Sequence, residues 1–116
     1  MTGAEARRSP RVVPATPMPV VNVMHDRVIG FAQDVSSGGM RLLASQPLVD
    51  EGLYQVQVAL DFGGRQPQMI EAGVQVVSQR ETAGGERLAG VRFVHLPKAH
   101  AQTLARWLAA HHRPDA

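Results

Sequence analysis

Short runs of alternating apolar and polar residues recur along most of this chain, and turn residues separate them. The clearest run, residues 53–60, places apolar side chains on one face with glutamines between them: Tyr54, Val56, Val58 and Leu60. A period of two is typical of a β-strand with one buried face. The pattern therefore favours a fold built from short, paired strands.

Segments of this kind predict six strands, at residues 20–24, 27–33, 40–44, 53–60, 68–79 and 87–95. The turns between them contain glycine, proline or aspartate, as at residues 25–26, 63–64 and 84–85. Gly73, inside the fifth strand, predicts a β-bulge. Six strands with short antiparallel connections favour a small closed barrel, so we expect an all-β fold class.

One helix is predicted after the last strand, where Pro97 suits the first helical turn because its missing N–H needs no partner there. Beyond it, small and apolar residues recur at helical spacing, with Trp107 at the margin: Ala101, Leu104, Ala105 and Leu108. This stripe should pack on the barrel. The last turn, before Pro114, holds groups that complement exposed carbonyls rather than bind metal: His111, His112 and Arg113.

The composition limits the chemistry that this chain can perform. Its 116 residues suffice for one domain with one modest core, and the absence of cysteine excludes disulfides, thiolate nucleophiles and cysteine-based zinc sites. The formal net charge is only +2 and aromatic residues make up 4% of the chain. These values argue against a nucleic-acid polymer as the ligand. No phosphate-binding Walker loop, H-E-x-x-H motif or nucleophile elbow occurs, so we do not expect an enzyme.

The N-terminal region does not resemble a signal peptide, because Pro14, Pro17 and Pro19 interrupt its apolar residues. The sequence also contains no run approaching the ~20 apolar residues of a membrane span. We therefore expect a cytoplasmic protein without membrane insertion, as a monomer or weak homodimer.

Two short stretches carry the chemistry that could bind a ligand. The first, residues 7–11, is here called the arginine strap because it holds Arg7, Arg8 and Arg11. Guanidinium groups match phosphate oxygens bidentately, and Pro10 favours an extended backbone around itself. The second stretch is a turn with a carboxylate, a hydroxyl and two glycines: Asp34, Ser36, Gly38 and Gly39.

In that turn, Asp34 and Ser36 can each hydrogen-bond nearby backbone N–H groups, and the glycines can take positive φ at little steric cost. The hairpin formed by the first two strands should bring the turn to the end of the barrel where the strap begins. Together the two stretches predict an anion site that also offers acceptors for the N–H edge of a base.

The pattern Arg7-x-x-x-Arg11 followed by Asp34-x-Ser36-x-x-Gly39 resembles the two signature motifs of the PilZ domain family. The resemblance covers about residues 5–112 and includes Gly38 to Leu42 after the turn and Gly90 to Phe93 before the helix. It implies a six-stranded antiparallel β-barrel of the split PilZ-like type with one C-terminal helix. We would divide such a single-domain member into a flexible segment carrying the strap (1–17), a barrel (18–96) and a helix (97–113).

The family resemblance also implies a function, that of a non-enzymatic receptor for cyclic di-GMP with no cofactor or metal. Arg7 and Arg11, assisted by Arg8, would grip phosphates and guanine edges. Asp34 and Ser36 would contact guanine or ribose from the opposite wall, while Gly38 and Gly39 would permit a close approach. Ligand binding should order the strap and relay the signal to an unidentified partner protein, in motility, pilus, exopolysaccharide or virulence control.

Two other interpretations stay open at the level of sequence. One is a PilZ-like module that binds a partner protein without the nucleotide, against which the intact arginines argue. The other is a small barrel that binds single-stranded nucleic acid, which the scarce aromatic residues and low net charge disfavour.

Overall fold

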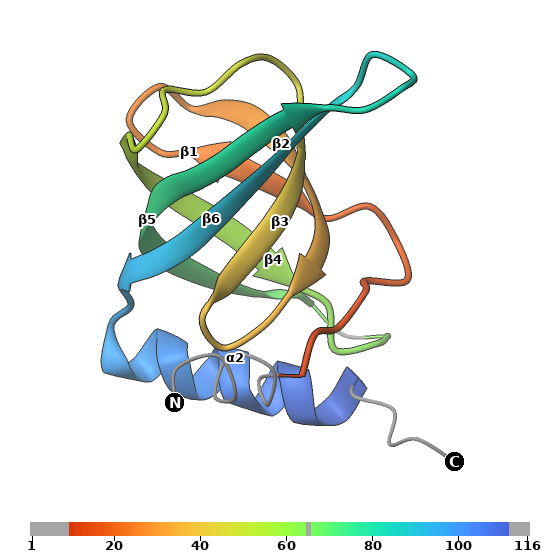
Figure 1. Cartoon of the computed structure of the whole chain (residues 1–116). Helices are drawn as coiled ribbons and strands as arrows, with labels where there is room; N and C mark the ends of the chain where they lie inside the picture. Colours follow the sequence, from red (N-terminus) through yellow and green to blue (C-terminus); the bar gives the residue numbers. More distant parts are fainter. Residues whose placement is uncertain (1–9, 65, 112–116) are drawn as a thin grey trace, which may run out of the picture.

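The computed structural model describes residues 10–64 and 66–111, which form a β-barrel with one helix (Figure 1). The strands are β1 (Pro19–Asn22), β2 (Arg27–Val35), β3 (Gly39–Ala44), β4 (Leu53–Leu60), β5 (Gln68–Glu81) and β6 (Arg87–His95), and the helix is α2 (Lys98–His111). All strand pairs are antiparallel, and the barrel closes in the order β1-β2-β3-β6-β5-β4. The expected fold class, a six-stranded antiparallel barrel with a C-terminal helix, is confirmed.

The barrel interior is filled by aliphatic side chains that alternate along each strand. On β4 the predicted face is confirmed, since Val56, Val58 and Leu60 are buried and Tyr54 is half-buried. Together with residues from the other strands they form one continuous hydrophobic core. Because these side chains fill the inside of the barrel, its interior leaves no space for a polar ligand.

The strand boundaries agree with the predicted ones most closely where alternation is cleanest. The bounds of β4 and β6 are as predicted, whereas β1 is shorter and ends at Asn22. The side chain of Asn22 is buried, and its Oδ1 accepts a hydrogen bond from the backbone N–H of Met24 at 2.9 Å. This contact bends the chain into the turn, where Asp26 adopts a positive φ of 52°.

The second strand is longer than predicted, because β2 continues through Asp34 to Val35. A register shift against β3 lies between Ala32 and Asp34, and it interrupts the alternation that would have revealed the continuation. The predicted irregularity at Gly73 is confirmed by a register shift between Gly73 and Val74.

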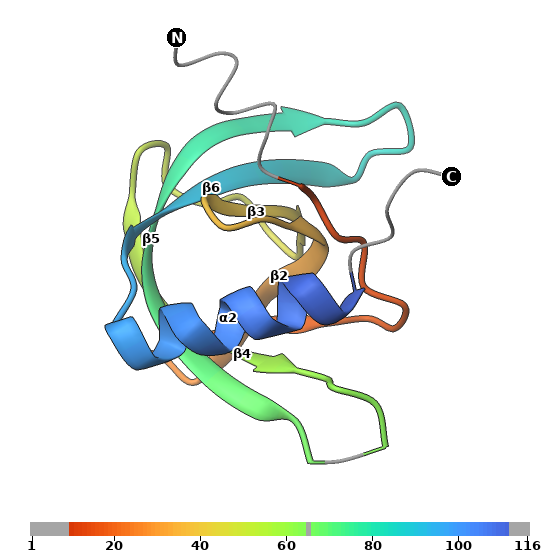
Figure 2. The ribbon, with the colours of Figure 1, turned by 90° about the horizontal axis from the view of Figure 1, so that it is seen from below.

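Helix α2 lies across one open end of the barrel (Figures 1 and 2). Leu104 and Trp107 are its fully buried residues, and the indole N–H of Trp107 donates to the carbonyl oxygen of Asp61 at 3.0 Å. At the other end of the helix, the backbone N–H of Glu71 donates to Nδ1 of His100 at 2.8 Å. The helix is therefore fixed to β5 and to the loop after β4 by hydrogen bonds as well as by apolar contact.

The predicted buried face of the helix is wrong at two residues, Ala105 and Trp107. Trp107 lies at the centre of the contact and is only 1% exposed, whereas Ala105 faces solvent. The stripe is rotated because the two large side chains, Leu104 and Trp107, bury far more area than an alanine does. His111 contacts the last turn as predicted, with Nδ1 at 2.9 Å from the carbonyl oxygen of Trp107. His112 and Arg113 lie outside the described residues.

A membrane-crossing helix would need to be longer and more apolar than any helix in the described part of the chain.

Candidate ligand-binding site

The end of the arginine strap is attached to the barrel. Val12 forms an isolated antiparallel bridge with Val35, the last residue of β2. The N–H of each valine donates to the carbonyl oxygen of the other, at 2.8 and 2.9 Å. Arg11 precedes this bridge and is exposed, while Arg7 and Arg8 lie outside the residues that the structure describes.

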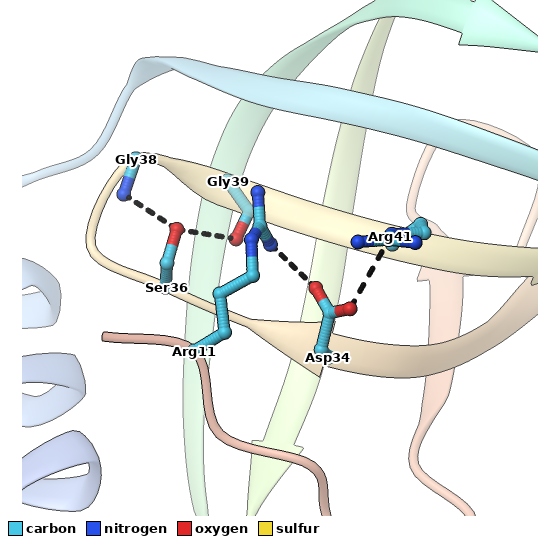
Figure 3. A network of polar contacts seen from close by, with 6 residues as sticks. All are labelled: Arg11, Asp34, Ser36, Gly38, Gly39 and Arg41. Carbon is cyan, nitrogen blue, oxygen red and sulfur yellow. Dashed lines mark hydrogen bonds and ion pairs between the residues drawn. The ribbon is translucent and has the colours of Figure 1, made fainter. Parts of the chain in front are cut away.

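Asp34 joins the two motifs that the sequence singled out (Figure 3). Its Oδ1 accepts a hydrogen bond from the guanidinium of Arg11, and its Oδ2 lies 3.3 Å from Nε of Arg41 on β3. The Asp34 side chain is 13% exposed, whereas the two arginine side chains are about half exposed. The expected bonds from Asp34 to backbone N–H groups are therefore replaced, in the described residues, by two ion pairs.

Ser36 is buried and stabilises the turn between β2 and β3. Its Oγ accepts a hydrogen bond from the backbone N–H of Gly38 at 3.2 Å and donates to the carbonyl oxygen of Gly39 at 3.4 Å. The backbone N–H of Ser36 also donates to the carbonyl oxygen of Gly39, at 2.9 Å. The predicted role of Ser36 as a hydrogen-bonding residue of the turn is confirmed.

The reason for the two glycines differs from the predicted one, because neither Gly38 nor Gly39 has a positive φ. A Cβ atom at Gly39 would lie 2.1 Å from the carbonyl oxygen of Val91, so glycine is required there by the close approach of β6. A Cβ atom at Gly38 would meet no atom within 4 Å. The expectation of left-handed glycines is thus wrong, and strand packing accounts for Gly39.

A pocket of about 480 Å³ lies on the outer wall beside this turn. Arg11 at the end of the strap, the turn and strands β3, β5 and β6 line it, and among the lining residues are four arginines: Arg11, Arg41, Arg80 and Arg92. Ser36, Gly38 and Gly39 also line it, so the pocket gathers the described site residues predicted from the sequence apart from Asp34. Asp34 lies beside it, in contact with Arg11 and Arg41.

The hollow of the pocket follows from the pairing of β3 with β6. Gly39 is opposite Arg92 and Arg41 is opposite Gly90, so each arginine faces a residue without a side chain. An arginine beside a glycine can reach over the low surface that the glycine leaves. Arg92 is held in position by Gln75 on β5, whose Oε1 accepts from its Nε at 3.0 Å and from its Nη2 at 2.8 Å.

Three of these arginines were missed by the sequence-based prediction. Arg41 follows the buried Met40 and Arg92 follows the buried Val91, so period-two alternation does indicate that both side chains face outward. Alternation cannot indicate that β3 lies beside β6, because these strands are far apart in the sequence. Arg80 lies on β5, which is next to β6 in the barrel, so its place in the pocket also depends on the strand order β3-β6-β5.

The arrangement suits a ligand with more than one negative charge. Within the described residues, Asp34 is the only carboxylate within ion-pair distance of the pocket arginines, and it contacts two of the four. Guanidinium groups at several points around a hollow can bind separate anionic groups of one ligand, each through paired N–H donors. Ser78 adds a hydroxyl group to the wall, whereas the amide of Gln79 is hydrogen-bonded to the backbone of Leu48.

Comparison with known proteins gave one family. The family model for the PilZ domain matches residues 5–110 of this chain. A search of curated proteins found no match.

Solved structures with the same fold are similar over most of the chain. The Bacillus subtilis inhibitor of motility MotI/DgrA superposes with a TM-score of 0.71 at 12% identity, covering 89% of this chain and 49% of that protein. The PilZ domain of Escherichia coli YcgR, solved with c-di-GMP, gives 0.68 at 19% identity and covers 90% of both chains. A longer YcgR structure from Escherichia coli, in complex with c-di-GMP, gives a TM-score of 0.65 at 20% identity. The match covers 90% of this chain and 45% of that chain. The chain thus spans about half the length of MotI and of the longer YcgR structure.

Proposed function

Because the chain belongs to the PilZ domain family, we propose that it is a receptor for cyclic di-GMP that binds the dinucleotide in the arginine-rich pocket beside the β2–β3 turn. The YcgR structures to which it is similar contain this ligand. The role is non-catalytic, and it consists of binding the ligand and passing the signal to another protein.

The observation that supports this proposal is that Arg11, at the end of the strap, and the turn after β2 line one pocket. Arg11 and Ser36 are 25 positions apart in the sequence and line the same hollow, together with three arginines from β3, β5 and β6. Cyclic di-GMP carries two phosphodiester charges and two guanine bases. A pocket with several guanidinium groups and with polar acceptors at its edge complements both parts of such a ligand.

We assign roles to the predicted site residues on this basis. Arg7 and Arg11 contact phosphates and guanine edges, with assistance from Arg8. The carboxylate of Asp34 accepts from a guanine N–H edge, after one of its arginine partners moves to a phosphate. Ser36 contacts the ligand from the turn, and Gly38 and Gly39 leave room for it.

The signal from the bound dinucleotide would pass to a separate partner protein. MotI, which shares the fold, is described as an inhibitor of motility, so motility is the first process in which to look for that partner. Suppose that the protein has one state that binds the partner and one that does not. The ligand can then change the affinity for the partner only as far as the ligand binds one of these states more tightly than the other.

Isothermal titration calorimetry tests the proposal with three ligands: cyclic di-GMP, GTP and a short single-stranded oligonucleotide. We expect tight binding of the cyclic dinucleotide alone. A charge-assisted contact contributes about 1.5–3 kcal/mol, so Arg7→Ala and Arg11→Ala should each weaken binding by roughly 10- to 100-fold.

Arg106→Ala is the matched control, because Arg106 lies on α2, outside the pocket, and contacts Gln68 at 3.2 Å. This variant should bind as wild type does. If wild-type protein gives no heat with cyclic di-GMP, the receptor proposal is wrong, and a module that binds only protein becomes the better interpretation. Tight binding of the oligonucleotide would instead favour a nucleic-acid barrel.

A further inference from the structure

The last four residues of β2 have no pairing partner on β1. The first residue of β1, Pro19, pairs with Phe31, so β2 extends four residues beyond its neighbour. The carbonyl oxygen of Met18 accepts from the N–H of Ala32 at 2.9 Å, and Val12 then bridges Val35. The chain before β1 thus provides hydrogen-bond partners for the edge of β2 that β1 does not reach.

Val12 is bound to this edge by its side chain as well as by its backbone. It is 4% exposed and belongs to the hydrophobic core, in which Val35 is 1% exposed. Its neighbour Val13 is 74% exposed and pairs with no strand residue in the described structure. Of these two adjacent valines, Val12 is the one that anchors the strap.

The register of the bridge decides where Arg11 points. In an antiparallel pair of strands, the residue before Val12 lies opposite the residue after Val35, so Arg11 is opposite Ser36. Side chains alternate between faces, so burial of Val12 and Val35 puts Arg11 and Asp34 together on the outer face. The ion pair between Arg11 and Asp34 agrees with this register. A slip of one residue would turn Arg11 toward the core.

We infer that Val12 is a positioning residue of the proposed binding site, whose bridge with Val35 fixes the C-terminal end of the strap before ligand arrives and presents Arg11 to the pocket. This inference rests on the proposed function for its effect on ligand affinity, but the docking itself does not require the ligand. Arg11 would therefore already be in place in the free protein.

Amide hydrogen exchange of the ligand-free protein tests the docking directly. We expect slow exchange at Val12 and Val35 in wild type and in Val13→Ala, and faster exchange at both positions in Val12→Ala. Fast exchange of these amides in wild type, with the neighbouring β2 amides protected, would overturn the inference whether or not the protein binds cyclic di-GMP.

Calorimetric titration with cyclic di-GMP tests the effect on the site. Val12→Ala should weaken binding by roughly tenfold, because two buried methyl groups are lost and ligand binding must then supply the docking energy. Val13→Ala should bind as wild type does, and Val12→Ile should retain most of the affinity. Equal affinities of Val12→Ala and Val13→Ala, with wild type binding tightly, would contradict the inference and leave the receptor function intact.

Two further variants separate positioning from general destabilisation. Val58→Ala removes a core side chain of β4 that is 2% exposed and outside the pocket, so it should lower stability without changing affinity. In an Arg11→Ala background, adding Val12→Ala should weaken binding much less than tenfold, because the group that it positions is gone. A full tenfold effect in that background would show that Val12 does not act through Arg11.

Discussion

Asp34 shows how a single residue can order a site without stabilising the fold greatly. Exposed ion pairs contribute about 0–1 kcal/mol each, and both arginine partners of Asp34 are about half exposed. The pairs therefore matter less for stability than for holding two long side chains beside the pocket while no ligand is bound. An anionic ligand would offer the same arginines a second partner, so binding in the proposed site would exchange one charge contact for another.

Gly38 and Gly39 are adjacent, but only Gly39 lies so close to another strand that a side chain would clash. This difference gives a prediction at the scale of one residue. Gly39→Ala places a Cβ atom 2.1 Å from the carbonyl oxygen of Val91 and should cost about 1–3 kcal/mol or more, because β3 and β6 must separate. Gly38→Ala meets no neighbouring atom and should be nearly neutral. Urea denaturation of both variants measures the difference, and equal stabilities would contradict this account of Gly39.

At the scale of elements, the alternation in the sequence predicted strands well where one face is buried throughout. In β4, alternate residues from Val56 to Leu60 are buried, as expected for a half-buried strand, whereas in β6 only Ala89 and Val91 are buried although its bounds also match. The end of β2 was missed because Gln33 and Asp34 are polar and the register shift between Ala32 and Asp34 breaks the period. Periodicity also placed Trp107 at the margin of the helix, since it counts apolar positions and takes no account of side-chain size.

Helix α2 gives the prediction at this scale, because one of its large buried side chains can be truncated without touching the pocket. Leu104 is 2% exposed, and Leu104→Ala should lower the free energy of unfolding by about 2–5 kcal/mol. Gln102→Ala, on the exposed face of the same helix, should stay within about 0.5 kcal/mol of wild type. Urea denaturation followed by the emission of Trp107, the single tryptophan, reports both variants. A change at Gln102 as large as that at Leu104 would show that the packed face is assigned wrongly.

At the scale of the whole molecule, the arginine-lined pocket depends on the order of strands around the barrel. The motifs predicted that Arg11 and Asp34 would meet, because the hairpin of β1 and β2 connects strands adjacent in sequence. They could not predict Arg41, Arg80 and Arg92 as neighbours, because β3, β6 and β5 are adjacent in the barrel but out of sequence order. Local patterns fix which way a side chain faces, and only the closed topology fixes what it faces.

Binding of cyclic di-GMP in the proposed site should stabilise the barrel, because the pocket gathers residues of β3, β5 and β6 that meet only in the folded state. A ligand present at about 100 times its Kd stabilises the folded state by ~2.7 kcal/mol, which for a chain of this size corresponds to a rise in Tm of roughly 10 °C. Thermal unfolding with and without cyclic di-GMP measures this rise.

Two variants check that this rise comes from the pocket. At the same ligand concentration, Arg11→Ala should show about half the rise or less, because its affinity is lower. Leu104→Ala should start from a lower Tm and still gain a similar rise. An equal rise in wild type and Arg11→Ala would mean that the ligand stabilises the protein from another place.

The filled interior of the barrel has a consequence for how a signal could be read. A ligand bound in the proposed pocket would lie on the outer wall of the barrel, with one side against the strands and the other exposed to solvent. A partner protein that docks on that wall would contact a composite surface, formed by the bases of the bound ligand and by protein side chains. This surface would exist only while the second messenger is present at high concentration. Recognition by the partner would then require no large rearrangement of the strands, because the bound ligand itself completes the surface that the partner contacts.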